Sequence, residues 1–397
     1  MPKPHIAFFN FPAPPHVNPT LSVVSTLVRR GYRISYVTSS RFEPIISELG
    51  AECVLCTGFP AAADFKPDPD WPKWLTWDDI GRKRPFVEIA VRTLSEVTKH
   101  YEEDRPDLVL YDSLVFGGRV LAEQWRIPAI QTTPIFAFRD VYFTRKNGVC
   151  YTPQGFVEFG EKLDAFFLDH GIPEKNNLFH KERLNIHFFP RAFQFNAEAF
   201  DERFFFAGGC IAERPTQGVW KRKSTDGKPI ILVSASTTGS DGPEYFRMFV
   251  EALKDLPWSV VIATGEITEF STFDCMPENV EVHQYLPYPM ILPHACLNIC
   301  HGGTNTIVES MYHGVPLICI SRSAESAEYS KRVEELGVGI HITQPEITAE
   351  LIRNAVLEVT KDTSMLKRVK EMQQTIRREK GGAKDVADQV ELMLSRH

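Results

Sequence analysis

The chain has 397 residues, of which 43% are hydrophobic and 24% charged, a composition typical of a globular protein with room for two domains. Its formal net charge of −7 provides no basic surface, so we expect no nucleic-acid partner. No apolar run reaches the length of a membrane span and no signal peptide is expected, so we predict a cytoplasmic protein. The eight cysteines are scattered and lie mostly in apolar runs, as reduced core thiols do.

The first third of the chain alternates apolar runs with amphipathic segments, which predicts a doubly wound α/β domain with a buried parallel sheet. A proline-rich loop at 12–19 separates the first strand from the first helix. This loop lacks the G-x-G-x-x-G pattern, which argues against a dinucleotide-dependent oxidoreductase. We expect strands at 5–11, 33–39, 52–56, 107–112 and from 128 onward, and helices at 20–31, 85–103 and 117–125.

Two stretches of the first half are rich in aromatic residues without a clean period. Residues 60–80 form an irregular loop with three tryptophans, and residues 135–190 contain many phenylalanines and tyrosines. Such residues line apolar ligand pockets, but single aromatic side chains more often belong to a core.

Residues 213–228 are polar, with glycine, proline and a basic cluster, and we interpret them as a linker between domains. The alternation of strands and helices restarts after this linker, which predicts a second α/β domain. We expect strands at 229–236, 259–265, from 280 onward, 296–300 and 316–321, and helices at 242–255, 304–313 and onward to a last one at 382–396.

The segment 285–326 carries the most specific pattern in the chain. A strand at 296–300 leads through the turn His301-Gly302-Gly303 into a helix from Thr304 to His313. A helix N-terminus preceded by two glycines suits a phosphate, and Glu309 suits the hydroxyl groups of a ribose. An ordinary strand-to-helix turn explains the same residues, and the segment alone leaves both interpretations open.

Two cysteines in this strand raise the alternative of a zinc site. Cys296 and Cys300 lie beside His294 and His301 in the sequence. An extended strand spreads these side chains along the sheet, so we expect them to pack in the core.

Several stretches resemble the GT-B glycosyltransferases that modify small molecules, especially the bacterial macrolide and antibiotic glycosyltransferases of the UDP-glycosyltransferase family. They are Tyr285-Leu286-Pro287-Tyr288, the segment from His301 to Glu309, Glu325-Ser326, and the regions 5–40 and 107–134. The resemblance implies the GT-B form of the α/β class, with two Rossmann-like, doubly wound parallel-sheet domains and an interdomain cleft. It implies an acceptor-binding domain at 1–212, the linker at 213–228, a nucleotide-sugar-binding domain at 229–380 and a C-terminal helix, 381–397, that packs back on the first domain.

The resemblance also assigns a catalytic pair. His16 matches the histidine of the family's G-H-V-N-P pattern, which is the base that deprotonates the acceptor hydroxyl; here Pro15 replaces the glycine. Asp112 ends a neighbouring strand and matches the acid that stabilises the protonated histidine. The implied reaction is an inverting single displacement of a nucleoside diphosphate.

The remaining site residues follow from the resemblance in the same way. For the donor, Ser236, Tyr288 and Ser326 depart from the usual residues, and the shorter Ser326 favours a modified or deoxy sugar. For the acceptor, the aromatic residues expected to bind are Trp74, Phe136, Phe138 and Tyr142. The implied donor-binding residues are Thr237, Tyr285, Leu286, His301, Gly303, Asn305, Thr306, Glu309, Glu325 and Ser326.

These patterns predict a hexosyltransferase that moves glucose or a modified sugar from a UDP- or dTDP-sugar to a hydroxyl of a small apolar natural product. We expect no cofactor and no obligatory metal, and a monomer or homodimer. A catalytically silent auxiliary protein that activates a partner glycosyltransferase, or a nucleotide-sugar epimerase of the same fold, are the alternatives. Neither alternative needs the His16 base.

Overall fold

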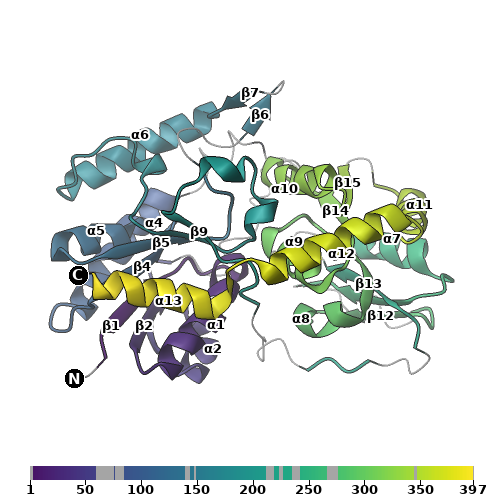
Figure 1. Ribbon diagram of the computed structural model, residues 1–397, viewed down its shortest axis with the longest axis horizontal. Helices are drawn as coiled ribbons and strands as arrows, with labels where there is room; N and C mark the ends of the chain where they lie inside the picture. The colour runs from purple at the N-terminus through teal and green to yellow at the C-terminus, as the bar shows by residue number, and fades with distance from the viewer. Residues whose placement is uncertain are drawn as a thin grey trace. The chain divides into compact units, whose positions relative to one another are not determined.

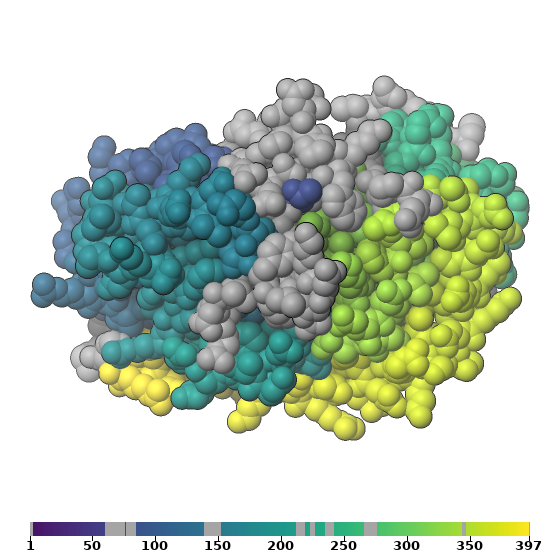
Figure 2. Space-filling model, turned by 90° about the horizontal axis from the view of Figure 1, so that it is seen from above, coloured from purple at the N-terminus to yellow at the C-terminus, as the bar shows by residue number. Residues whose placement is uncertain are grey.

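The computed structural model describes residues 3–59, 76, 85–138, 144–146, 149–211, 219–222, 227–234, 242–265, 276–343 and 347–396. Figure 2 shows these residues in colour. The chain forms two compact units. The first unit contains the described residues up to 211 and those from Glu379 onward. The second unit contains the described residues from 219 to 378. No helix within the described ranges is long and apolar enough to cross a membrane.

The first unit is built on a parallel sheet in the order β3-β2-β1-β4-β5-β8-β9. The five strands predicted from continuous apolar runs are confirmed. The last two strands are only three residues long and lie in the aromatic-rich region, where no period indicates them. The strands are β1 (His5–Phe9), β2 (Arg33–Thr38), β3 (Glu52–Leu55), β4 (Leu108–Asp112), β5 (Ala129–Thr133), β8 (Asn185–His187) and β9 (Phe204–Phe206), with a separate hairpin of β6 (Thr144–Lys146) and β7 (Val149–Tyr151).

Helices cover both faces of this sheet, because successive strand residues point to opposite sides. Ile6 and Phe8 of β1 pack with α1, α2 and α13 in one core cluster, whereas Phe9 faces α4 and α5. The last helix, α13, packs against α1 (Figure 1), and Arg30 pairs there with Asp388 at 2.7 Å. The helices are α1 (Pro14–Arg29), α2 (Glu43–Glu48), α4 (Phe86–His100), α5 (Phe116–Trp125), α6 (Gln154–Asp169) and α13 (Gly382–Ser395), with 3-10 turns η1 (Ser40–Phe42), η3 (Asn177–Phe179), η4 (Arg191–Phe193) and η5 (Ala197–Ala199).

Helix α1 begins earlier than the sequence pattern indicates. The expected loop at 12–19 is wrong, because α1 starts at Pro14 and includes His16 in its first turn. Proline is well tolerated in the first turn, where the missing N–H would have no partner and the fixed φ suits a helix. Pro19 lies further inside the helix, where its ring also lacks a backbone N–H to donate. Pro15 therefore presets the helical turn that carries His16.

The second unit contains a parallel sheet in the order β12-β11-β10-β13-β14-β15. The strands predicted after the linker are confirmed, and the helix from Thr304 to His313 has the predicted bounds. The strands are β10 (Ile230–Ser234), β11 (Ser259–Ala263), β12 (Val280–His283), β13 (Ala295–Cys300), β14 (Leu317–Ser321) and β15 (Gly339–Thr343); the helices are α7 (Pro243–Leu253), α8 (Tyr288–Ile291), η8 (Leu292–His294), α9 (Thr304–His313), α10 (Ala324–Glu335), α11 (Ala349–Val359) and α12 (Thr363–Arg378).

Each sheet has a point where its strand order reverses. In the first unit this point lies between β1 and β4, and in the second between β10 and β13. Ligands of open α/β sheets bind beyond the carboxyl ends of the strands at such points. His16 follows β1, Asp112 ends β4 and His301 follows β13, so the principal candidates occupy these two positions.

Candidate functional site

His16 and Asp112 are in direct contact in the first unit. Strands β1 and β4 are parallel neighbours, with Phe9 opposite Tyr111, so the residues after β1 and at the end of β4 meet at one edge of the sheet. Nδ1 of His16 lies 2.7 Å from Oδ2 of Asp112, and the side chains are 12% and 2% exposed. The two residues are 96 positions apart in the sequence, so it is the fold that brings them into hydrogen-bond contact.

Asp112 is held from its second oxygen, and the chemistry of a carboxylate gives the direction of its bond to His16. Its second oxygen, Oδ1, accepts the backbone N–H of Leu114 at 2.9 Å, which holds the carboxylate in place. An ionised carboxylate only accepts, so Nδ1 of His16 carries the proton. Nε2 then has a free lone pair, and it has no hydrogen-bond partner among the described residues. This arrangement leaves Nε2 able to take a proton from a ligand.

The turn after β13 depends on its two glycines. Gly302 has a φ of +82°, which favours glycine, and a Cβ there would lie 2.4 Å from Oγ of Ser330. Gly303 is the N-cap of α9, and no side chain caps this helix start. Asn305 and Thr306 follow in the first turn, and Glu309 is buried one turn further on. The start of α9 therefore offers backbone N–H groups and a positive dipole end to an anion.

His301 is neutral at physiological pH in this structure. The pKa of its imidazole is lowered to about 4, first by burial and then by the charge of Arg322, while a backbone hydrogen bond with Ser234 acts in the opposite direction. A neutral imidazole can donate one hydrogen bond but adds no positive charge. Favourable charge at this site therefore comes from the helix start and from Arg322.

A substitution at Gly303 tests whether binding of a nucleoside diphosphate depends on the position of His301. A Cβ on Gly303 would come within 2.5 Å of Nε2 of His301, although its φ of −74° suits any residue. Gly303→Ala should displace the imidazole and weaken binding of a nucleoside diphosphate about tenfold, since overpacking costs about 1–3 kcal/mol. Titration calorimetry with the nucleoside diphosphate measures this change.

Gly242→Ala is the matched control. Gly242 is also the N-cap of a helix in this unit, with a φ of −72°, and a Cβ there meets no atom of the described structure within 4 Å. Equal affinity of both variants would show that the position of His301 does not matter for binding.

Other predicted donor residues lie on or near the same unit's helix starts. Tyr285 is 39% exposed, whereas Leu286 is buried. Oε1 of Glu325 accepts the hydroxyl of Tyr329 at 3.4 Å. Ser326 is engaged in a capping box: it accepts the backbone N–H of Ser323 at 3.1 Å and contributes to the start of α10. The spacing of the two serines is a capping signal that the sequence interpretation missed.

Two of the predicted acceptor residues, Phe136 and Phe138, lie within the described part of the first unit. Phe136 is 3% exposed and packs among other phenylalanine rings, so it belongs to the aromatic core of the first unit. Phe138 is partly buried. The predicted residues Trp74, Tyr142 and Thr237 lie outside the described residues.

The cysteines of β13 do not form a metal centre. Cys300 lies beside Cys319 of β14, with their sulfur atoms 3.8 Å apart, and both are buried. Across the described part of the chain, no group of three or more His, Cys, Asp or Glu residues could hold a metal ion. Among the free cysteines of the described residues, Cys56, Cys210, Cys300 and Cys319 are buried in the core as predicted, whereas Cys53 and Cys296 are partly exposed.

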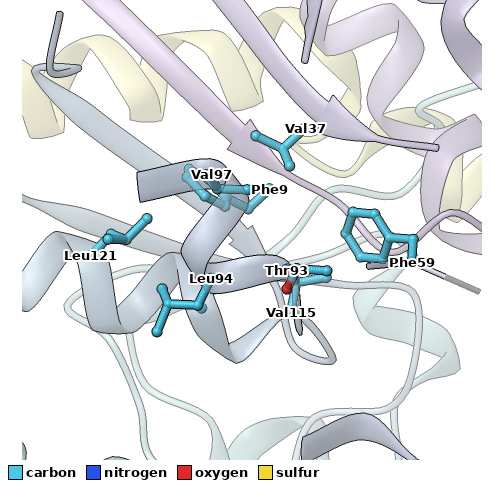
Figure 3. Close-up of a pocket in the computed structure, with 9 residues that line it drawn as sticks. Phe9, Val37, Phe59, Thr93, Leu94, Val97, Val115 and Leu121 are labelled. Atoms are coloured by element: carbon cyan, nitrogen blue, oxygen red, sulfur yellow. The ribbon is translucent and has the colours of Figure 1, made fainter. Parts of the chain in front are cut away.

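A small apolar hollow lies between the sheet of the first unit and helices α4 and α5 (Figure 3). It has no room for a water molecule, so we interpret it as a packing gap. Its lining includes Phe9, Val37, Phe59, Leu94, Val115 and Leu121.

Comparisons with known proteins identify relatives along the whole chain. Residues 247–392 match the family described as erythromycin biosynthesis protein CIII-like, C-terminal domain. NDP-glycosyltransferase YjiC of Bacillus licheniformis is 34% identical over 395 residues, which cover 98% of each chain. Demethyllactenocin mycarosyltransferase of Streptomyces fradiae is 31% identical over 404 residues, covering 98% of this chain and 87% of that protein.

This chain is also similar in structure to a protein whose structure has been solved. The calicheamicin glycosyltransferase CalG4 aligns with 100% of this chain and 99% of its own, at 32% sequence identity and a TM-score of 0.84. The similarity therefore spans both units, each with its parallel sheet.

Proposed function

Because this chain belongs to the bacterial antibiotic glycosyltransferases of the UDP-glycosyltransferase family and has their GT-B fold, we propose that it is an inverting enzyme whose catalytic base is His16. The observation that carries this proposal is the hydrogen bond of 2.7 Å between Nδ1 of His16 and the buried Asp112. A sugar-transfer enzyme with a hydroxyl acceptor needs a base that works near neutral pH, and a histidine paired with a carboxylate provides one.

In the proposed reaction, Nε2 of His16 removes the proton of the acceptor hydroxyl as its oxygen forms a bond to the anomeric carbon. The bond from that carbon to the diphosphate breaks on the opposite face, and the nucleoside diphosphate leaves with the electron pair. Attack opposite the leaving group inverts the anomeric configuration. The proton stays on the imidazolium, which the negative charge of Asp112 stabilises.

We propose that the start of α9 holds the diphosphate of the donor. Its backbone N–H groups and dipole, together with Asn305, Thr306 and the neutral His301, would stabilise the charge that develops on the leaving group. Glu309 would accept hydrogen bonds from the ribose, and the exposed ring of Tyr285 would stack on the base. These roles require no metal ion.

The names of the relatives support the proposed substrates. One relative is named for transfer of mycarose to demethyllactenocin, and the solved structure is named for calicheamicin. We accordingly propose that this enzyme transfers glucose or a modified hexose from a UDP- or dTDP-sugar to a hydroxyl of a small apolar natural product.

Nucleotide binding tests the proposed donor class. UDP or dTDP at about 100 times its dissociation constant should stabilise the folded protein by about 2.7 kcal/mol, since a ligand of the folded state alone shifts the unfolding equilibrium. Thermal unfolding with UDP, dTDP, GDP, ADP and NAD measures the shift, and uridine or thymidine is the control that lacks the diphosphate. Stabilisation by NAD alone would contradict a nucleotide-sugar donor.

A further inference from the structure

A buried chain of hydrogen bonds lies directly behind His16. Asn10 follows β1, Tyr36 belongs to β2 and Thr20 lies on α1, and each of the three is at most 2% exposed. Nδ2 of Asn10 donates to the backbone carbonyl of His16 at 3.0 Å and also to the hydroxyl of Tyr36. That hydroxyl lies 2.7 Å from Oγ1 of Thr20, which donates to the carbonyl of Val17 at 2.8 Å. We call these three side chains the Asn10 network.

The chemistry of these groups allows one direction for every proton. The carbonyls of His16 and Val17 only accept, so the amide nitrogen of Asn10 faces the first and the Thr20 hydroxyl donates to the second. The amide nitrogen only donates, so the oxygen of Tyr36 accepts from it and its proton goes to Thr20. No alternative arrangement satisfies both carbonyls, and the network therefore has a single conformation.

Two further features show that these side chains serve as fixed donors. Oδ1 of Asn10 is buried without a hydrogen-bond partner among the described residues, so the amide is held for its N–H groups. Burial raises the pKa of the Tyr36 hydroxyl far above its ordinary value, so the phenol keeps its proton throughout the working pH range of the protein.

The two carbonyls that the network fixes belong to consecutive residues at the start of α1. Their peptide groups set the direction in which the His16 side chain leaves the backbone, while Asp112 holds the ring itself through Nδ1. A catalytic group must be held to within about 0.5 Å, and supporting hydrogen bonds commonly provide that precision.

We propose that Asn10, Tyr36 and Thr20 are positioning residues that hold His16 in its catalytic orientation through the backbone of α1. This inference rests on the proposed role of His16 as the base. The network contacts no substrate, so it should affect the turnover number and leave substrate binding unchanged.

Tyr36→Phe is the first test, and Tyr101→Phe is its matched control. Tyr101 is also buried, at 1% exposure, and its hydroxyl lies 2.7 Å from that of Ser35, so each variant loses a buried hydroxyl-to-hydroxyl bond. Tyr36→Phe also loses the bond that Asn10 donates to the phenol oxygen. Both variants should lose thermal stability, Tyr36→Phe the more of the two, because it also leaves a buried N–H of Asn10 unpaired. Tyr36→Phe should lower kcat about tenfold with the KM of donor and acceptor unchanged, whereas Tyr101→Phe keeps kcat. Equal kcat in the two variants would overturn the proposal.

Two variants of Thr20 provide a second test, which does not depend on the folding of the Tyr36 variant. Thr20→Ser keeps the hydroxyl that links Tyr36 to the carbonyl of Val17, whereas Thr20→Val keeps the shape and removes it. The serine variant should retain kcat and the valine variant should lose about tenfold. A valine variant as active as the serine variant would show that the hydroxyl does not position His16.

A double-mutant cycle separates this inference from the proposed function. If Tyr36 acts through His16, adding Tyr36→Phe to His16→Ala should cause no further loss of kcat. An inactive His16→Ala beside a fully active Tyr36→Phe would reject the network and keep the base. A His16→Ala variant with wild-type kcat would reject both.

Discussion

His16→Ala is expected to lower sugar transfer about 10²–10⁴-fold and to leave nucleotide binding unchanged. In the proposed reaction the imidazole removes the acceptor proton, and the buried Asp112 supports it through Nδ1. The proposed donor-binding residues belong to the second unit, whereas His16 belongs to the first. Initial rates of nucleoside diphosphate release measure the transfer, and the thermal shift with UDP or dTDP measures the binding.

His100→Ala is the control for this variant. His100 ends α4, is 36% exposed and lies 3.5 Å from Glu52, at the start of β3 and so at the opposite edge of the sheet from His16. Its removal should not change kcat. Transfer by His16→Ala at a rate close to that of wild type would show that another group is the base.

Asp112→Asn should lower kcat almost as much as His16→Ala does. The reason is the hydrogen bond that Oδ1 of Asp112 accepts, because it decides how the new amide is oriented. The backbone N–H of Leu114 needs an acceptor, so the amide oxygen should take that place and the amide NH₂ should face His16. Nδ1 of His16 would then have to accept, which puts the ring proton on Nε2. A base that already carries its proton cannot take another, so kcat should fall by at least about a hundredfold with unchanged KM.

Asp107→Asn is the matched control, since Asp107 lies just before β4 and Asp112 ends it. Asp107 is exposed, and Oδ2 accepts the backbone N–H of His5 at 2.7 Å. Nitrogen NMR of the imidazole reports the tautomer in both variants. An Asp112→Asn variant with the proton on Nε2 and undiminished kcat would contradict the proposed role of the pair.

Much of the fold was predictable because both sheets are parallel and buried on both faces. Such strands read as continuous apolar runs, and β1, β10 and β14 stand out for this reason. The start of α1 was not predictable from composition, because prolines indicate a loop unless their place in the first helical turn is known. The three-residue strands β8 and β9 are too short to show a period.

The site was predictable only in part. His16 and Asp112 could be placed at the ends of neighbouring strands, but their distance depends on the register of β1 and β4, which the sequence does not give. Tyr36 reads as one more apolar strand residue, because nothing nearby in the sequence shows that its hydroxyl meets Thr20 inside the core. Ser326 was interpreted only through the resemblance, although its spacing from Ser323 already indicates a helix cap.

The most direct test of the central claim, that His16 is the general base, compares wild type and His16→Ala across a series of substituted phenols as acceptors. A base matters most for a weakly acidic hydroxyl and least for one that ionises unaided. The ratio of the two kcat values should therefore be largest for the least acidic phenol and should fall towards one for 4-nitrophenol. A ratio that stays the same across the series would contradict proton removal by His16 and would leave it only a structural role.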